Sequence, residues 1–521
     1  MKKLLFILLV VLSVFGCRKE PTTWNTEVLA PLATGSLSLS DIIPDSISYV
    51  DENFLYHLVF NESISDLNVD SLVTIPDTIF SQKYVVPFSS GTISLPAGTE
   101  IISVNEEIEV GNEDVELHRI IMKSGYLKYK VKSYINGYMT CIYNLPGATI
   151  DGTALAITAN VSPSVGDIPT VSEGQFDLTN YTFDLTGETG NGFNQLFSIG
   201  TVSVSSDAPS NAAVQGQDSV VVELEFIDAK VKYAKGYFGQ HLYSFSQDVS
   251  FLDDIQIPSG VLMLDQARMN LKIENNVGVD ARFTFNAIEA GNDNAALALD
   301  YAPFNNAINL TRAIDNGGSV TPFIANYLIN ENNSNLTSFI GLLPTQLNIQ
   351  GQIEINPLGN ISGASDFIYT DNPLKASVEV DVPLRVGLEG LGLQDTLDIS
   401  LEQDVTANGY IVLVAENYFP FSAELKLTLL EDENYPQEII LNGGYISPGY
   451  ESFTGVVLNP SVSTIRIPFT TGLLERLREE NRMIARVNFN TPDFPQVYSL
   501  YDKYKIDLRM FIEATAEVEI K

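Results

Sequence analysis

The sequence predicts a mainly β protein, built of two to three antiparallel, sandwich-like units with a few short helices. Short runs rich in Val, Ile, Tyr, Phe and Thr alternate apolar with polar residues, which is the period of a half-buried strand. These runs stop at Gly, Pro, Asn or Asp, which favour turns. The chain is 45% hydrophobic and 18% charged, a balance typical of globular proteins.

The clearest alternating runs recur along most of the chain. They are residues 125–135, 219–238, 268–275, 375–388, 422–430 and 506–520. A chain of 521 residues is long enough for about two to four domains. We expect β domains over residues 36–215, 216–410 and 411–521.

Helical periodicity is rare and predicts two helices. One extends over about residues 471–486, with Thr471 as its cap and an apolar stripe on one side. The stripe consists of Leu473, Leu474, Leu477 and Ile484. The other is short, begins at a cap on Ser334 or Asn335 and ends before Pro344. We expect both helices to be packing elements.

The first 17 residues have the pattern of an export signal that ends at a cysteine. Two lysines precede an apolar run over residues 4–15, which is too short to cross a bilayer, since a crossing needs about 20 residues. The residues Val14-Phe15-Gly16-Cys17 resemble the lipoprotein box of bacterial lipoproteins. The resemblance implies that residues 1–16 are removed and that Cys17 carries acyl chains such as palmitate. The alternative is a plain signal peptide with a chance cysteine.

Residues 17–35 are expected to form a lipidated tether, because Pro21, Pro31 and Gly35 discourage both helix and regular strand. Several acyl chains, at about 0.8 kcal/mol per buried methylene, hold a protein stably at a membrane. Arg18 directly after the cysteine points to an outer membrane, at its periplasmic face or at the cell surface.

The acidic composition argues against nucleic acid as a partner, because such binding needs basic patches. The formal net charge is −36, and loss of Lys2 and Lys3 with the signal gives −36 − 2 = −38. Anionic headgroups would repel this surface, so the acyl chains must hold the protein at the membrane. Cys141 is the only other cysteine, and its apolar neighbours predict a buried thiol without a disulfide.

Three blocks carry a wider resemblance. They are TWNTEVLAPL near the start, GYFGQ at 236–240 and NSNLTSFIGLLP at 333–344. Through them the chain is similar to uncharacterised β-rich outer-membrane lipoproteins of the Bacteroidetes. The resemblance implies an envelope location and supplies no activity.

No catalytic motif is evident. His57, His118 and His241 lie far apart, with neither a His-x-His nor a His-x-x-x-His pair, so we expect no metal site. No glycine-rich phosphate loop and no Gly-x-Ser-x-Gly elbow before a helix is present, so we expect no cofactor and no enzyme activity.

Acidic clusters leave one enzymatic alternative open, a surface polysaccharide hydrolase that uses two facing carboxylates. The candidate clusters are Asp253 with Asp254, Glu113 with Asp114 and Glu116, and Glu431 with Asp432 and Glu433. Calcium at Asp253, Asp254 or Asp293 is a further alternative. In a chain with 65 acids such clusters are expected as solvated turns, which is the favoured interpretation.

The segment KYAKGYFGQHLYSF at 232–245 is the most unusual one in the chain. Its candidate ligand-binding residues are Tyr233, Tyr237, Phe238 and Tyr243, because exposed rings on a strand can stack on sugars or bind a partner. The competing interpretation, which the usual burial of strand aromatics favours, is a bulge or corner at Gly236 and Gly239 beside the core.

Two hypotheses about function follow. The first is a lipid-anchored envelope protein that binds a partner protein, an apolar ligand or a glycan without catalysis. The second is the surface hydrolase. A cleft with two carboxyl groups about 5–10 Å apart would favour the hydrolase, and an apolar groove or an aromatic patch would favour binding.

Overall fold

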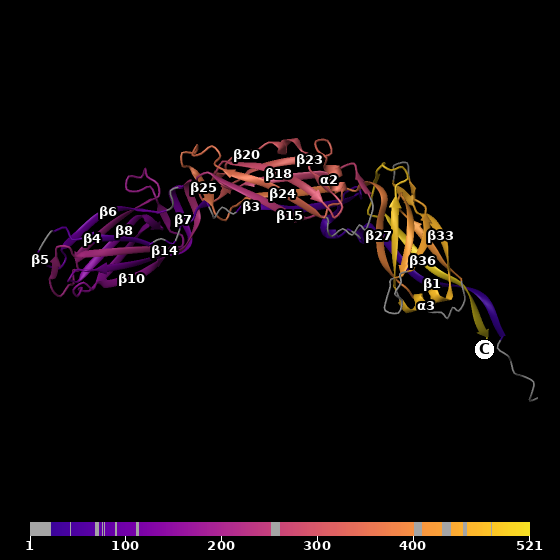
Figure 1. The fold of residues 1–521 in the computed structure, drawn as a ribbon, viewed down its shortest axis with the longest axis horizontal. Helices are drawn as coiled ribbons and strands as arrows, with labels where there is room; N and C mark the ends of the chain where they lie inside the picture. The colour runs from indigo at the N-terminus through magenta and orange to yellow at the C-terminus, as the bar shows by residue number, and fades with distance from the viewer. Residues whose placement is uncertain are drawn as a thin grey trace, which may run out of the picture.

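The computed structural model describes residues 22–520 except 42, 68–71, 76, 78, 89–90, 111–113, 252–260, 401–408, 430–438, 452–455 and 481. Antiparallel sheets dominate, and the α-helices of the described residues are short, so the predicted mainly β class is confirmed. Figure 1 shows three β units that follow one another along the long axis of the molecule. None of the described helices is long and apolar enough to cross a membrane.

The first unit is built on one ten-stranded antiparallel sheet. Short β11 pairs with both β7 and β8 and so joins the two halves of the sheet. The strands are β4 (Ile79–Val85), β6 (Glu100–Glu109), β7 (Glu116–Ser133), β8 (Met139–Ile150), β9 (Thr153–Val161), β10 (Thr170–Asp177), β11 (Thr182–Asp184), β12 (Gln195–Val204), β14 (Ser219–Tyr237) and β25 (Asp366–Tyr369). A separate pair, β5 (Thr92–Leu95) with β13 (Ala212–Gln215), lies at the outer end of the unit.

The middle unit contains two sheets. One consists of β2 (Ser48–Val50), β3 (Tyr56–Leu67), β26 (Leu374–Pro383), β17 (Arg268–Asn275) and β23 (Phe323–Asn330). The other consists of β15 (His241–Ser250), β24 (Gln346–Ile355), β18 (Ala281–Gly291), β19 (Ala296–Ala298) and β20 (Ile308–Leu310). Helix α2 (Leu336–Gly341) and the hairpin β21 (Ile314–Asp315) with β22 (Val320–Thr321) complete the unit.

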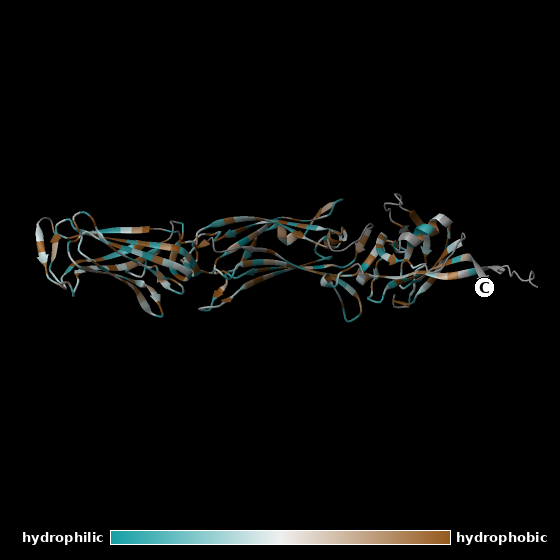
Figure 2. Cartoon of the chain, turned by 90° about the horizontal axis from the view of Figure 1, so that it is seen from below, coloured by the Kyte–Doolittle hydropathy of each residue, from teal (hydrophilic) through white to brown (hydrophobic). Residues whose placement is uncertain are grey.

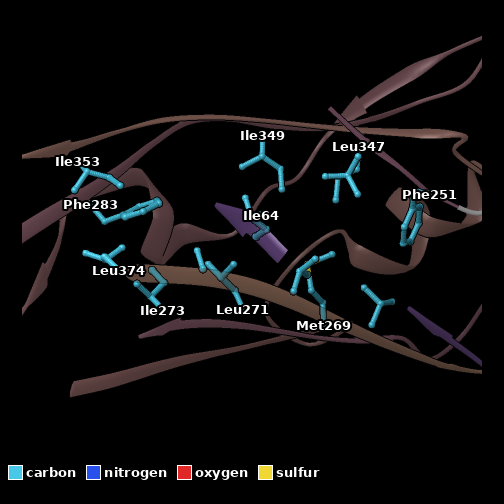
Figure 3. Close-up of a cluster of buried hydrophobic side chains, with 14 of the residues drawn as sticks. Ile64, Phe251, Met269, Leu271, Ile273, Phe283, Leu347, Ile349, Ile353 and Leu374 are labelled. Atoms are coloured by element: carbon cyan, nitrogen blue, oxygen red, sulfur yellow. The ribbon is translucent and has the colours of Figure 1, made fainter. Parts of the chain in front are cut away.

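The core of the middle unit lies between its two sheets. Figure 3 shows Leu271 and Ile273 of β17 and Ile64 of β3 turned toward Ile349 and Phe283 of the other sheet. These five side chains are at most 2% exposed. Alternating strand positions therefore bury one face of each sheet, as the sequence pattern predicts. Figure 2 shows the same alternation as short hydrophobic and hydrophilic bands along many strands.

The third unit also has two sheets. One consists of β1 (Thr22–Ser38), β36 (Lys505–Ile520), β28 (Gly409–Asn417) and β33 (Ser461–Phe469). The other consists of β16 (Val261–Leu264), β27 (Arg385–Asp398), β34 (Arg482–Asn490), β29 (Ser422–Leu429), β30 (Ile439–Ile446) and β35 (Tyr498–Ser499). The pair β31 (Tyr450–Glu451) with β32 (Val457–Asn459) and helix α3 (Thr471–Glu480) belong to the same part of the chain.

The chain visits the units in nested order, so the sheets do not follow the contiguous ranges 36–215, 216–410 and 411–521. It starts in the third unit with β1, enters the middle unit with β2 and β3, builds most of the first unit from β4 to β14, and then returns. Strand β14 lies entirely beyond residue 216 yet belongs to the first unit, and β3 belongs to the middle unit. These groupings depend on pairings between strands far apart in sequence, which local patterns do not report.

The tether expected over residues 17–35 is wrong from Thr22 onward, because β1 pairs with β36 along its whole length. Pro31 is tolerated where the register shifts between Pro31 and Ala33. Gly35 does not break the strand either, because it pairs with Leu508 of β36. The missing side chain also lets β1 lie close to β27. A side chain at this position would collide with Leu397 of β27.

The C-terminal helix is shorter than expected. Helix α3 ends at Glu480, and Arg482–Asn490 form β34 instead of continuing the helix to 486. In β34 the buried side chains alternate, and the strand pairs with both β27 and β29. Pairing on two sides therefore outweighs the helical spacing of Ile484. In the other helix, the Leu336 N–H donates to Ser334 Oγ at 3.1 Å, as the cap prediction allows.

Cys141 is buried in β8, as its apolar neighbours predict. Its side chain is 4% exposed, and burial raises the pKa of the thiol to about 12. A thiol with this pKa stays protonated at neutral pH, so it reacts poorly with labelling reagents.

Candidate functional site

The aromatic segment 232–245 forms a tight corner between the first and middle units. Strand β14 shifts register between Lys235 and Gly236, and a side chain at Gly236 would collide with the Glu116 carbonyl oxygen. Gly239 has a positive φ of 77°, which favours glycine. These two glycines let the chain leave one sheet and enter the next as β15.

The four predicted ligand-binding rings do not form an exposed patch. Phe238 is fully buried and Tyr233 is 5% exposed, while Tyr237 and Tyr243 are half-buried. Tyr243 packs against the main core beside His241, with ring centroids 6.1 Å apart. A fully buried ring cannot stack on a ligand from solution, so this geometry favours the corner interpretation for Phe238.

Tyr233 contributes to the joint between the two units. Its ring lies 4.7 Å from the Tyr369 ring, and both hydroxyl groups donate to Asp315, each at 2.9 Å. Asp315 is in β21, so the β21–β22 hairpin of the middle unit contacts β14 and β25 of the first unit's sheet. A cavity of about 400 Å³ adjoins this contact. Three of the polar groups that line it, Tyr233, Tyr369 and Asp315, are already joined by these two hydrogen bonds. Fewer donors and acceptors therefore remain for a ligand.

A cluster of ion pairs around the buried Asp366 lies at the same joint. Asp366 of β25 has no exposed surface, and its Oδ1 lies 3.3 Å from Arg312 Nη1. Arg312 Nη2 also contacts Asp280 Oδ2 at 2.6 Å, and Asn356 Nδ2 donates to Asp366 Oδ2 at 2.9 Å. Burial raises the pKa of the Asp366 carboxyl group. Hydrogen bonds from Ser362 and Asn356 lower this pKa, but the effect of burial is larger, so the pKa stays above its ordinary value.

Because its pKa is raised by folding, Asp366 should lower the stability of the protein as pH rises. The folded protein holds the Asp366 proton more tightly than the unfolded chain, so stability falls from the ordinary carboxyl pKa of 3.8 upward. We expect Asp366→Asn to gain stability relative to wild type between pH 4 and pH 7, in urea unfolding at several pH values. Parallel pH profiles for the two proteins would contradict this assignment.

Two of the three histidines, His57 and His241, bond to nearby polar groups. His57 is 9% exposed; its Nδ1 lies 2.7 Å from Asp381 Oδ1 and 3.2 Å from the Tyr49 hydroxyl, and its Nε2 lies 3.8 Å from Asp51 Oδ2. None of these partners is a serine, threonine or cysteine nucleophile. His241 Nε2 bonds the Phe238 carbonyl oxygen at 2.7 Å, which holds the imidazole against the corner after β14.

Several predicted carboxylates lie outside the described residues, namely Glu113, Asp253, Asp254, Glu431, Asp432 and Glu433. Of the others, Asp114 is exposed, and Glu116 accepts a hydrogen bond from Asn360 Nδ2 at 3.0 Å. Among the residues that the structure describes, no group of three His, Cys, Asp or Glu side chains is arranged to hold a metal ion.

A polar pocket that sequence reasoning missed lies at the outer end of the first unit. We call it the free-end pocket; it has a volume of about 570 Å³. It is lined by Lys83, Tyr134, Asn136, Ser164, Gly166, Asp167, Gln215, Gly216, Gln217, Asp218, Ser219 and Val221. The Gly216 N–H donates to the Gly91 carbonyl oxygen just before β5 at 3.2 Å. Figure 1 places β5 at the end farthest from the C-terminus.

Side chains around the free-end pocket are available for a ligand. Lys83, Asn136, Asp167, Gln215 and Gln217 form no side-chain hydrogen bond or ion pair with other residues in the described ranges. The pocket is built from loops after β7, after β9 and after β13, which lie far apart in sequence. Of these loops, only Gly-Gln-Asp at 216–218 has a recognisable sequence pattern, and that pattern predicts an ordinary turn and not a binding site.

Comparisons with known proteins give no family. No family model and no curated protein matches the chain. Among solved structures, one match is the crystal structure of a "putative secreted protein" from Parabacteroides distasonis, with a TM-score of 0.30 and 12% identity. The match covers 53% of this chain and 89% of that chain. A likeness this weak carries no argument about function.

Proposed function

We propose that this protein is a non-catalytic envelope lipoprotein whose third unit sits at the outer membrane and whose first unit is held away from it to bind a ligand or partner. The observation that carries the proposal is the start of β1. Thr22 pairs with Ile520, only five residues after Cys17. Five residues span at most about 18 Å, so acyl chains on Cys17 would keep the third unit close to the bilayer.

The arrangement of the units supports the second half of the proposal. The first unit lies at the opposite end of the molecule from β1 (Figure 1). The chain passes between the first and middle units at β3 to β4, β14 to β15, β24 to β25 and β25 to β26. Domains joined by a single linker move freely, whereas several crossings and the Tyr233–Asp315–Tyr369 contact restrain the joint. The molecule therefore suits the role of a spacer.

The hydrolase alternative has less support. Its named carboxylates lie outside the described residues, in exposed positions, or in a hydrogen bond at the joint. Those that lie within the described residues do not line the free-end pocket.

The distance of each unit from the membrane tests the proposal. Single cysteines at Glu27→Cys in the third unit and Asp167→Cys in the first unit are labelled with a donor dye, and the protein is inserted into vesicles with acceptor lipids. We expect strong energy transfer from residue 27 and little from residue 167. Cys141 can stay, because it is buried. Equal transfer from the two sites would contradict the upright arrangement.

A further inference from the structure

We propose that the free-end pocket binds a short neutral oligosaccharide and that the Gln217 side chain contacts it. The inference rests on the proposed function, because it takes the free end to be the part presented to the surroundings. The inference adds to the proposed function the chemical class of the ligand and one residue that contacts the ligand.

The pocket has the chemistry of a site for hydroxyl groups. Lys83 donates hydrogen bonds, Asp167 accepts them, and the amides of Asn136 and Gln217 do both. Sugar hydroxyls also donate and accept, so each can satisfy groups of either kind. A volume of about 570 Å³ falls within the range of small-molecule sites.

Other ligand classes fit less well. An apolar molecule would remove water from Asp167, Lys83 and the amides without replacing their hydrogen bonds, at a cost in affinity. A polyanion would meet Asp167 and Asp218 against a single lysine, in a chain with a net charge of −36. A neutral, hydroxyl-rich ligand avoids both penalties.

The loop that supplies Gly166 and Asp167 to the pocket also exposes two apolar side chains. Val165 and Ile168, which flank these two lining residues in sequence, are 78% and 73% exposed. Their backbones bond each other, with Ile168 N–H donating to the Val165 carbonyl oxygen at 3.2 Å, so the loop holds both side chains at the surface. The C–H face of a sugar ring can cover such side chains while its hydroxyls face the pocket.

The backbone conformation of Gln217 singles it out among the residues that line the pocket, independently of the chemistry of their side chains. Residues 215–218 form a turn in which Asp218 N–H donates to the Gln215 carbonyl oxygen at 3.1 Å. Asp218 Oδ2 also accepts from the Gln215 N–H at 2.7 Å. Gln217 occupies the third turn position with φ at 89°, where glycine is usual. A glutamine in this conformation lowers stability, and such residues concentrate at functional sites.

The experiment measures glycan binding by the full chain, purified in detergent, on an array of neutral and anionic oligosaccharides, followed by calorimetry with the strongest neutral binder. We expect saturable binding of neutral oligosaccharides. Gln217→Gly and Gln217→Ala should each weaken it about tenfold, because a hydrogen bond is lost. The urea midpoint of Gln217→Gly should be no lower than that of wild type, since glycine accepts this φ.

Phe54→Gly is the matched control, because Phe54 also has a positive φ of 64°, is 64% exposed and does not line the pocket. It should leave glycan binding unchanged. Binding to anionic glycans alone, no binding on the array, or full binding by Gln217→Ala would overturn the inference. The membrane-distance measurement reports the position of the units and the array reports the ligand, so failure of the proposed function and failure of the ligand assignment are distinguishable.

Discussion

Replacement of Cys17 by serine is expected to move the protein from the membrane fraction to the soluble fraction. The lipoprotein-like residues before Cys17 motivate this result. A hydroxyl cannot take the thioether-linked lipid, and each buried methylene of a lost acyl chain removes about 0.8 kcal/mol of membrane affinity. With a net charge of −36 for the whole chain, the protein surface should not hold anionic headgroups in place of the lipid.

Fractionation before and after a high-salt wash measures this effect. Cys141→Ser is the matched control, because Cys141 is a cysteine that is only 4% exposed and lies in β8 of the first unit. It should stay with the membrane. A Cys17→Ser protein that remains membrane-bound after the wash would disprove the anchor.

Truncation of Phe238 to alanine is expected to lower the free energy of unfolding by about 3–5 kcal/mol, the usual cost of removing a buried phenylalanine. Phe238 has no exposed surface, and its carbonyl oxygen bonds His241 Nε2 at 2.7 Å. The lost ring would leave a cavity where β14 passes into β15, next to the joint between the first and middle units.

Chemical unfolding of Phe238→Ala and Leu242→Ala measures this difference. Leu242 is near in sequence but 61% exposed, so its truncation should change stability by well under 1 kcal/mol. If Phe238→Ala unfolds like wild type but loses a ligand or partner, the ring belongs to a binding surface, and the corner interpretation fails.

Local patterns in the sequence were sufficient to predict the strands with the clearest alternation. The run predicted at 268–275 is β17, and the run at 219–238 corresponds to β14 at Ser219–Tyr237. The burial of Cys141 follows from its apolar neighbours in the same way. Apolar and polar residues alternate in a strand with a period of two residues, so a few consecutive residues are enough to recognise the pattern.

Only the tertiary structure shows which strands pair and which segments of the chain lie close together. Local reasoning took Pro31 and Gly35 as evidence for a tether, yet β36, from the far end of the chain, makes residues 22–38 a strand. The spacing of Ile484 fitted a helix until β27 and β29 were seen on both sides of it. A strand gains most of its stability from neighbours at large sequence separation, and no local window contains them.

The candidate site divides in the same way. The sequence drew attention to the aromatic segment at 232–245, where composition is unusual, but burial of Phe238 and Tyr233 depends on how the first and middle units meet. The free-end pocket joins loops around residues 136, 167 and 217, each ordinary by itself. Composition and periodicity thus determined the class of fold and the acidic surface. Long-range strand pairing decided which polar side chains converge, because convergence is a property of distances in space.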